Sequence, residues 1–339
     1  MYRLVFFVFF ILSVSACGSA DDYFDDYDNI KVIVTDPPSP KDSTNNNPSD
    51  TIIHGEDSTA VSKEYVICSY KKYMDISPRY GVGQGGACYD KYFFQGYQNN
   101  AAIGIYNLES KRSLGKIDIT DPTPSSNIHV NTINFGSQRF SEDDFFPLLY
   151  VSSGYCIKVG EDKCSFIYVY RIMRDVQSDG AEKFSVSLIQ TIKLKGFDHW
   201  TEGIIDNDHC ILWVKYAANG AEGPDRYASF CLPLFSIGDT DIFLKDHIVD
   251  FSVKAQPFTS SNQGHLYYND RIFLVSGTTP TTQKLAFIVI NTLTKSRELV
   301  IDLAEIGLRD EPENLFFYRD QLMIGYRNSI YEFNVKYLQ

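Results

Sequence analysis

Several features that mark common protein classes are missing from this sequence. Convincing helical periodicity is nearly absent, and the short runs rich in Val, Ile, Tyr and Phe indicate an all-β chain. No run of basic residues occurs, which argues against nucleic acid as a partner. There is no Cys-x-x-Cys pair or other zinc spacing, no Gly-x-Ser-x-Gly elbow and no phosphate loop, because no helix follows the glycine-rich residues 81–86. We therefore expect no metal site and no cofactor.

The longest apolar run of the sequence stands near the N-terminus, and it is too short to span a bilayer. Arg3 precedes Leu4–Leu12, and spanning a bilayer takes about 20 apolar residues. Small residues follow, which is typical of a secretory signal. The stretch Val-Ser-Ala-Cys, ending at Cys17, resembles the lipobox of bacterial lipoproteins, in which diacylglycerol is attached to the cysteine. The resemblance implies a signal peptide over 1–17 and a mature chain that begins at a lipidated Cys17. The alternative is an ordinary signal peptide with a bystander cysteine.

An acidic cluster follows this cysteine closely. It resembles the surface-export tag of lipoproteins in some Gram-negative bacteria, which implies an outer membrane lipoprotein that faces the cell surface. The alternative is a solvated acidic tether, because blocks of like charge are usually disordered. The cluster comprises Asp21, Asp22, Asp25, Asp26 and Asp28.

Residues 18–62 read as a linker. They contain ten acids and two lysines, so they carry a net charge of −8 out of −12 for the whole chain. Pro37–Pro40 and Thr44–Pro48 leave little apolar content for a core, and we expect a disordered tether here. The acidity is therefore weak evidence about any binding site. Residues 63–339 are aromatic-rich and long enough for one large all-β domain.

Six cysteines remain after Cys17, an even number that permits disulfides in an exported chain. Two pairs flank candidate hairpins, and the alternative is buried free thiols that act as small apolar residues. The pairs are Cys156 with Cys164 and Cys210 with Cys231, and the other two cysteines are Cys68 and Cys88.

Five stretches of the domain can be aligned with one another. Each reads as a first strand, a tight Asp/Asn turn and a second strand that ends near Gly, and two further strands generally follow. The copies begin near residues 84, 129, 202, 263 and 313. Four strands repeated about every 40–50 residues are typical of β-propeller blades. The domain resembles propellers in general, and we predict five blades of four antiparallel strands.

The fifth copy is one strand short, since only Ser329–Val335 follows its second strand. Glu64–Tyr70 precedes the first copy and has no blade of its own. We predict that this N-terminal strand completes the last blade, which hides edges that would otherwise pair with other chains. A propeller of six blades, with one hidden in residues 216–256, is the alternative.

In a propeller the first strand of each blade lines the central channel, so polar residues at the starts of these strands are candidate ligand-binding groups. The alternative is that they satisfy backbone ends and channel waters, as buried polar groups must. The candidates are Gln84, His129, Asn131, His199, Trp200, Glu202, Gln263, His265, Glu311, Glu313 and Asn314.

These groups favour a membrane-anchored module that binds a small molecule, glycan or protein without catalysis. The alternative is a glycoside hydrolase or lyase, in which Glu202 and Glu313 (or Glu311) would be the paired carboxylates and Trp200 a sugar platform. The first two blades argue against it, because they offer the amides of Gln84 and Asn131, which cannot transfer a proton.

If Cys17 carries the lipid, Cys17→Ser should abolish lipidation. Palmitate labelling and partitioning into a detergent phase measure this directly. A Cys17→Ser variant that still labels and partitions would contradict the lipoprotein assignment.

Overall fold

A computed structural model of the chain describes residues 29–35, 64–76, 80–98, 101–119, 130–153, 157–159, 162–197, 200–217, 225–253, 262–277 and 285–338. The chain divides into two compact units, residues 72–333 and residues 1–71 with 334–339. Within the described residues there is no α-helix, and no helix is long and apolar enough to cross a membrane. Cys17, His129, Cys156 and His199 lie outside the described residues.

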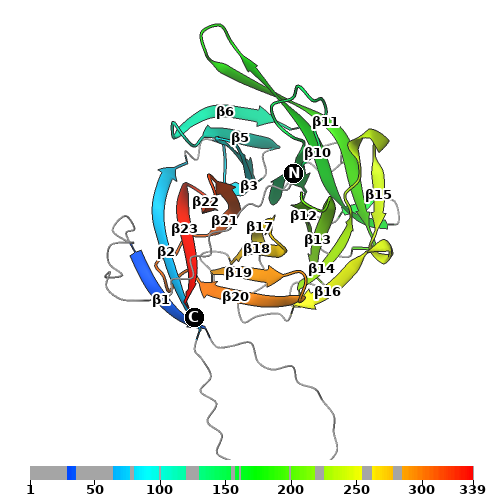
Figure 1. Cartoon of the computed structure of the whole chain (residues 1–339). Coiled ribbons are helices and arrows are strands. Elements are labelled where there is room, and N and C mark those ends of the chain that lie inside the picture. The colour runs from blue at the N-terminus through cyan, green and yellow to red at the C-terminus, as the bar shows by residue number, and fades with distance from the viewer. Residues whose placement is uncertain are drawn as a thin grey trace, which may run out of the picture. The chain divides into compact units, whose positions relative to one another are not determined.

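Five sheets, each with a four-stranded antiparallel core, are arranged in a ring (Figure 1). The first blade consists of β3 (Gly83–Tyr89), β4 (Tyr92–Tyr97), β5 (Ala102–Asn107) and β6 (Arg112–Asp118). The second consists of β7 (Thr132–Phe135), β8 (Leu149–Ser152), β10 (Asp162–Val176) and β11 (Glu182–Lys195). The third consists of β12 (Thr201–Asp206), β13 (Ile211–Ala217), β14 (Asp225–Cys231) and β16 (Val249–Val253). The fourth consists of β17 (Asn262–Tyr268), β18 (Arg271–Ser276), β19 (Ala286–Asn291) and β20 (Ser296–Asp302). The fifth is β21 (Pro312–Tyr318), β22 (Gln321–Tyr326), β23 (Ser329–Leu338), β2 (Glu64–Asp75).

The predicted five-bladed propeller is confirmed. The five first strands, β3, β7, β12, β17 and β21, begin within a few residues of the positions expected from the repeat. The six-bladed alternative is wrong, because residues 225–231 and 249–253 form the two outer strands of the third blade. Between them, β15 (Thr240–Phe243) leaves this blade and pairs in parallel with β11 of the second blade.

The predicted closing strand is also confirmed, and it extends to Asp75 rather than to Tyr70. The strand order in the fifth blade is β2-β23-β22-β21. Just beyond β2, the Ile76 amide donates a hydrogen bond to the Asn328 carbonyl at 2.7 Å. The Tyr73 hydroxyl donates to the Leu108 carbonyl of the first blade at 2.8 Å, so the end of β2 also fastens the fifth blade to the first.

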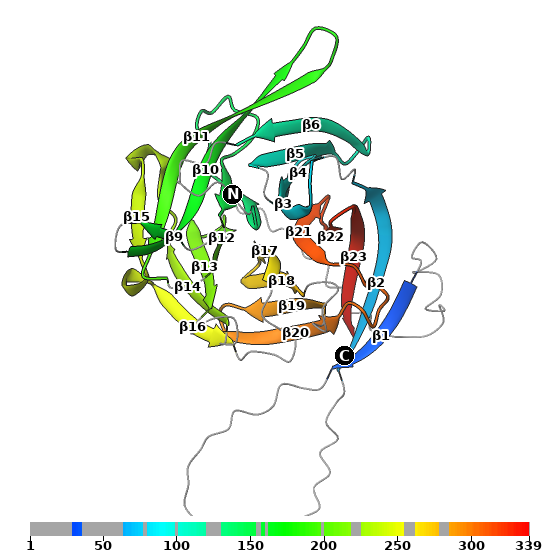
Figure 2. The ribbon, with the colours of Figure 1, turned by 180° about the vertical axis from the view of Figure 1, so that it is seen from behind.

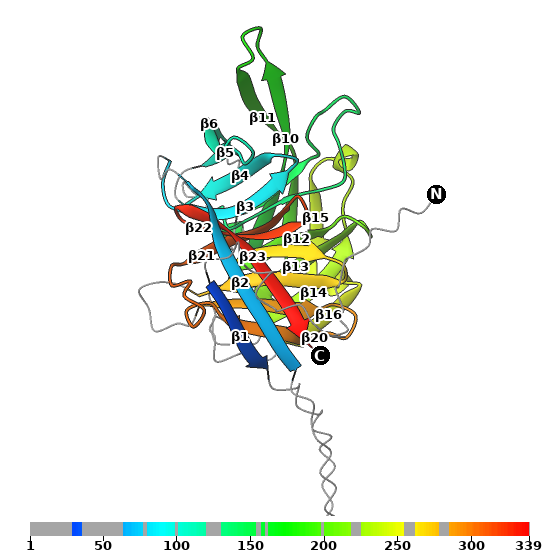
Figure 3. The ribbon, with the colours of Figure 1, turned by 60° about the vertical axis from the view of Figure 1, so that its left-hand side comes forward.

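A further strand, β1 (Asn29–Thr35), pairs antiparallel with β2 in the smaller unit, as Figure 3 shows. It lies inside the segment that the sequence analysis assigned to a disordered tether. The sequence Ile-Lys-Val-Ile-Val over residues 30–34 is rich in β-branched residues, which favour strands, and that signal was outweighed by the polar residues on both sides. The rest of 18–62 lies outside the described residues.

Two of the cysteine predictions can be compared with the structure. Cys210 and Cys231 do flank a hairpin, formed by β13 and β14, and both are exposed free thiols. β9 (Ile157–Val159) pairs with β10 to form the hairpin expected next to Cys164. Because Cys156 lies outside the described residues, its pairing with Cys164 stays a prediction.

Aromatic side chains join neighbouring blades. Phe94 of the first blade meets Phe146, which precedes the second strand of the second blade, edge to face at 5.2 Å. On the other side of the first blade, Phe93 stacks on Phe316 of the fifth blade, with 4.5 Å between the ring centres. Such pairs contribute about 0.5–1.5 kcal/mol each beyond the area they bury. The alternation of Phe93 and Phe94 on β4 thus fastens one blade to both neighbours.

The first strands of the blades approach one another closely around the centre of the ring (Figures 1 and 2). At Gly264 of β17, a Cβ atom would lie 2.4 Å from the Asn314 Cα of β21 and 2.9 Å from the Glu313 carbonyl oxygen. At Gly85 of β3, it would lie 2.2 Å from the Asn131 carbonyl oxygen. Backbone packs against backbone here, so the ring has no space for a side chain at these positions.

Gly264→Ala should therefore lower the free energy of unfolding by about 1–3 kcal/mol, because backbone atoms of β21 cannot move aside for the methyl group. Thermal denaturation of the wild-type and variant chains measures the difference. Ser185→Ala, at an exposed position of β11, is the control and should leave the melting temperature unchanged. Equal stability of Gly264→Ala and wild type would contradict the close approach.

Candidate functional site

The first strands of three blades begin with a β-bulge. Strand pairing passes over one extra residue between Gly83 and Gly86, and it skips Gln263 in β17 and Glu313 in β21. A bulge re-aims side chains and commonly stands beside functional sites. The bulges fall at equivalent places in the first, fourth and fifth blades, where the repeat had placed the candidates Gln84, Gln263 and Glu313.

Glu202 joins three blades through its carboxylate. The Asn131 side-chain amide, from the start of the second blade, and the Trp200 indole N–H, at 3.0 Å, both donate to Oε1. Oε2 lies 2.7 Å from Nδ1 of His265 in the fourth blade. Glu202 is only 1% exposed. The carboxylate therefore connects the second, third and fourth blades, and the pair of Oε2 with His265 Nδ1 is a close approach without regular hydrogen-bond geometry.

A second polar group connects the fourth blade to the fifth and the fifth to the first. The Gln263 amide donates to Glu311 Oε1 at 2.8 Å. The Arg327 guanidinium contacts both Glu311 and Glu313, and its Nε lies 3.2 Å from Glu313 Oε1. The Asn314 amide donates to the Gln84 carbonyl of β3 at 2.9 Å. Together with the contacts of Glu202, these bonds run from the second blade through to the first.

Nine of the eleven predicted site residues are described, and the structure brings them together at one end of the ring in these two groups. Glu202 belongs to the first group and Glu313 to the second, so the two candidate acids have different partners. All nine are buried except Trp200, which is half-buried. His129 and His199 lie outside the described residues, and their part in the site stays a prediction.

Arg327 is the residue that the sequence analysis missed. It follows β22 in a turn and bears no strand periodicity, and its guanidinium is about one-third exposed. The signal that could have found it is electrostatic. Glu311 and Glu313 stand two residues apart at the start of an inner strand, and two buried carboxylates need a nearby cation or a proton.

The protonation of Glu313 differs from that of an ordinary surface acid. Its side chain is 0% exposed, and burial raises its pKa well above the usual range, with the charge of Asp310 acting in the same direction. The Arg327 guanidinium opposes this rise, but it is shared with Glu311. The second carboxyl oxygen of Glu313 has no hydrogen-bond partner among the described residues. Burial therefore favours the neutral form of this carboxyl.

Other polar atoms at this end are buried without a partner within the described part of the chain. They include Nε2 of His265 and Oδ1 of Asn314. In the same described residues, no three His, Cys, Asp or Glu side chains come together in a way that could hold a metal ion. We call the two groups of polar side chains described above the polar floor. Trp200 and Arg327 are its more exposed members.

No family model and no curated protein matches this chain. Solved structures do resemble it. An aldose sugar dehydrogenase from Streptomyces coelicolor, in its PQQ-bound form, is 10% identical over 79% of this chain and 98% of that one, with a TM-score of 0.46. A glutaminyl cyclase from Myxococcus xanthus is 11% identical over 80% of this chain and 97% of that one, with a TM-score of 0.45. At these values the likeness carries no argument about function.

Proposed function

We propose that this chain is a lipid-anchored β-propeller outside the cytoplasm that binds a ligand at the polar end of its ring without catalysis. The observation that carries the proposal is the state of Glu202, the best-placed candidate acid. Each of its oxygens already faces a nitrogen, with Asn131 and Trp200 on one and His265 on the other. This is the setting of a structural anchor.

A general acid or base must reach the reacting atom to within about 2.6–3.2 Å. Glu202 is buried beneath its partners, and the corresponding positions of the first two blades carry the amides of Gln84 and Asn131. Amides donate and accept hydrogen bonds but transfer no proton at neutral pH. These features support recognition rather than bond cleavage.

A polyhydroxylated ligand such as a glycan suits this end of the ring best. The half-buried indole of Trp200 offers a flat apolar face, and its N–H is fixed by Glu202 at 3.0 Å. An exposed indole face packs on the apolar face of a sugar, while nearby amide and guanidinium groups bind the sugar hydroxyls. Arg327 supplies the guanidinium, which is held from behind by Glu311 and Glu313.

The location follows from the N-terminal segment. The lipobox-like sequence places a lipid on Cys17, and the acidic residues after it favour display on the outer face of the outer membrane. Several acyl chains on one cysteine give stable anchoring, since each buried CH₂ contributes about 0.8 kcal/mol. The membrane is then the first partner of the chain, and the glycan or protein ligand is the second.

A glycoside hydrolase or lyase is the second candidate, and the raised pKa of Glu313 favours it. A carboxyl with a raised pKa near a second carboxyl is the arrangement that such enzymes use for general acid catalysis. Against it, the Glu313 side chain is 0% exposed and is paired with Arg327.

Trp200→Ala should weaken binding of a glycan by roughly tenfold or more, because a lost stacking contact is worth about 1–3 kcal/mol. The full chain, purified in detergent, is first screened on a glycan array, and the affinity for the best glycan is then measured by titration. Phe140→Ala, an exposed aromatic in the β7–β8 connection, is the matched control. If Trp200→Ala and Glu313→Ala both leave the affinity unchanged, this end of the ring is not the site.

Glu202→Gln separates the two candidate functions. The amide oxygen can still accept from Asn131 and Trp200, while its NH₂ donates to His265 Nδ1 in the other ring tautomer. Folding and glycan binding should therefore be retained. Hydrolysis of the same glycan, followed by chromatography of the products, should be absent in both wild type and variant. Turnover by the wild type that falls by orders of magnitude in Glu202→Gln would establish the hydrolase instead.

A further inference from the structure

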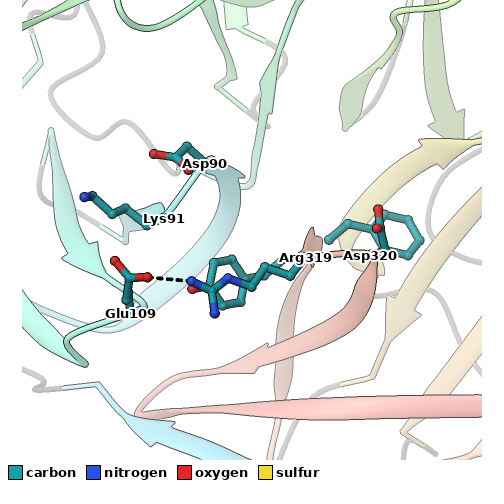
Figure 4. A pocket seen from close by; sticks show the side chains of 7 residues that line it. Asp90, Lys91, Glu109, Arg319 and Asp320 are labelled. Atoms are coloured by element: carbon teal, nitrogen blue, oxygen red, sulfur yellow. Dashed lines mark hydrogen bonds and ion pairs between the residues drawn. The ribbon is translucent and has the colours of Figure 1, made fainter. Parts of the chain in front are cut away.

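A cavity of about 440 Å³ lies at the other end of the ring unit, between the first and fifth blades (Figure 4). It is lined by the turn between β3 and β4 and by the turn between β21 and β22. β21 starts with Glu313 in the polar floor and ends with Tyr318 in this cavity. A strand advances about 3.3 Å per residue, so the cavity is a separate place roughly 15–20 Å from the floor.

The cavity carries charges of both signs on aromatic walls. Asp90 and Asp320, one from each turn, form no ion pair within the described residues. The positive groups are Lys91 and Arg319. Phe317 and Tyr318 provide ring surface, and the Arg319 guanidinium lies 5.2 Å from the centre of the Tyr318 ring.

The one ion pair that crosses the cavity is weakly held. Arg319 Nη2 lies 2.5 Å from Glu109 Oε1, and the two side chains are 67% and 55% exposed. Figure 4 shows Glu109 reaching the guanidinium from the first blade. Exposed pairs of this kind exchange readily for another carboxylate. A ligand carboxylate could therefore replace Glu109 without breaking any buried contact.

The turn that bears Arg319 has the same conformation as other hairpin turns of this propeller, in which Lys111 and Lys295 also have positive φ values. Arg319 and Asp320 have φ values of +50° and +63°, in the left-handed region. The equivalent turn of the fourth blade has the same conformation with Asn269 and Asp270, residue types that tolerate it well.

We propose that this cavity binds a small zwitterion, such as a free amino acid or a dipeptide. The ligand carboxylate pairs with Arg319, its ammonium group pairs with Asp320, and its apolar part packs on Phe317 and Tyr318. A ligand with one sign of charge would leave either the two acids or the two bases facing a like charge. The inference is independent of the glycan site and of the lipid anchor.

Isothermal titration calorimetry of the full chain in detergent at low salt tests this, with the common free amino acids and diglycine as probes. At least one probe should bind, and its N-acetylated and amidated forms should each bind at least tenfold more weakly, because each lacks one charge. Tighter binding of diglycine than of any free amino acid would identify a dipeptide as the ligand, and the reverse would identify a free amino acid.

Variants in matched blades give the second measurement. Arg319→Gln and Asp320→Asn should each lower the affinity at least tenfold. Arg271→Gln and Asp270→Asn are the controls, since they remove an Arg–Glu pair directly after the equivalent turn of the fourth blade and an aspartate within it. The proposal is overturned if no probe binds, if capped and uncapped probes bind alike, or if the Arg319 and Arg271 variants behave alike.

Discussion

The close approach of the first strands at the centre of the ring is the constraint on which the rest of this structure depends. Where β17 passes β21, and where β3 passes β7, backbone lies against backbone, and glycine occupies the contact. Side chains that reach across from one blade to the next then join the blades. Polar side chains do this at one end of the ring, and aromatic pairs such as Phe93 with Phe316 do it farther out.

This constraint explains why the polar residues at this end resemble an active site in the sequence, whereas in the structure they connect neighbouring blades. Carboxylates at the starts of inner strands can act on a substrate, or they can hold neighbouring blades. Glu202 lies against Asn131 and His265 from two other blades and Trp200 from its own, whereas Glu313 is paired with Arg327, which it shares with Glu311. A single set of buried acids therefore contains members suited to different tasks, and only the contacts distinguish them.

Much of the fold could be predicted from the sequence, because each blade repeats a local pattern of strand, turn and strand. Gln84, Gln263 and Glu313 were found by that repeat, although the bulges that re-aim them leave no local signal. Arg327 could not be found, since its importance depends on carboxylates brought to it by folding. The parallel pairing of β15 with β11 was equally hidden, because it crosses between blades and has no signature in either segment.

The closing strand also determines the order in which the molecule can be completed. Ile76 and Asn328 are hydrogen-bonded, yet about 250 residues separate them along the chain. During synthesis from the N-terminus, four blades can pair their own strands while β2 waits for β23 as its neighbour. Until then both the edge of β2 and the seam between the first and fifth blades are open to other chains. Contacts of such long range slow folding, so the pairing of β2 with β23 is expected to be a late and slow step in closing the ring.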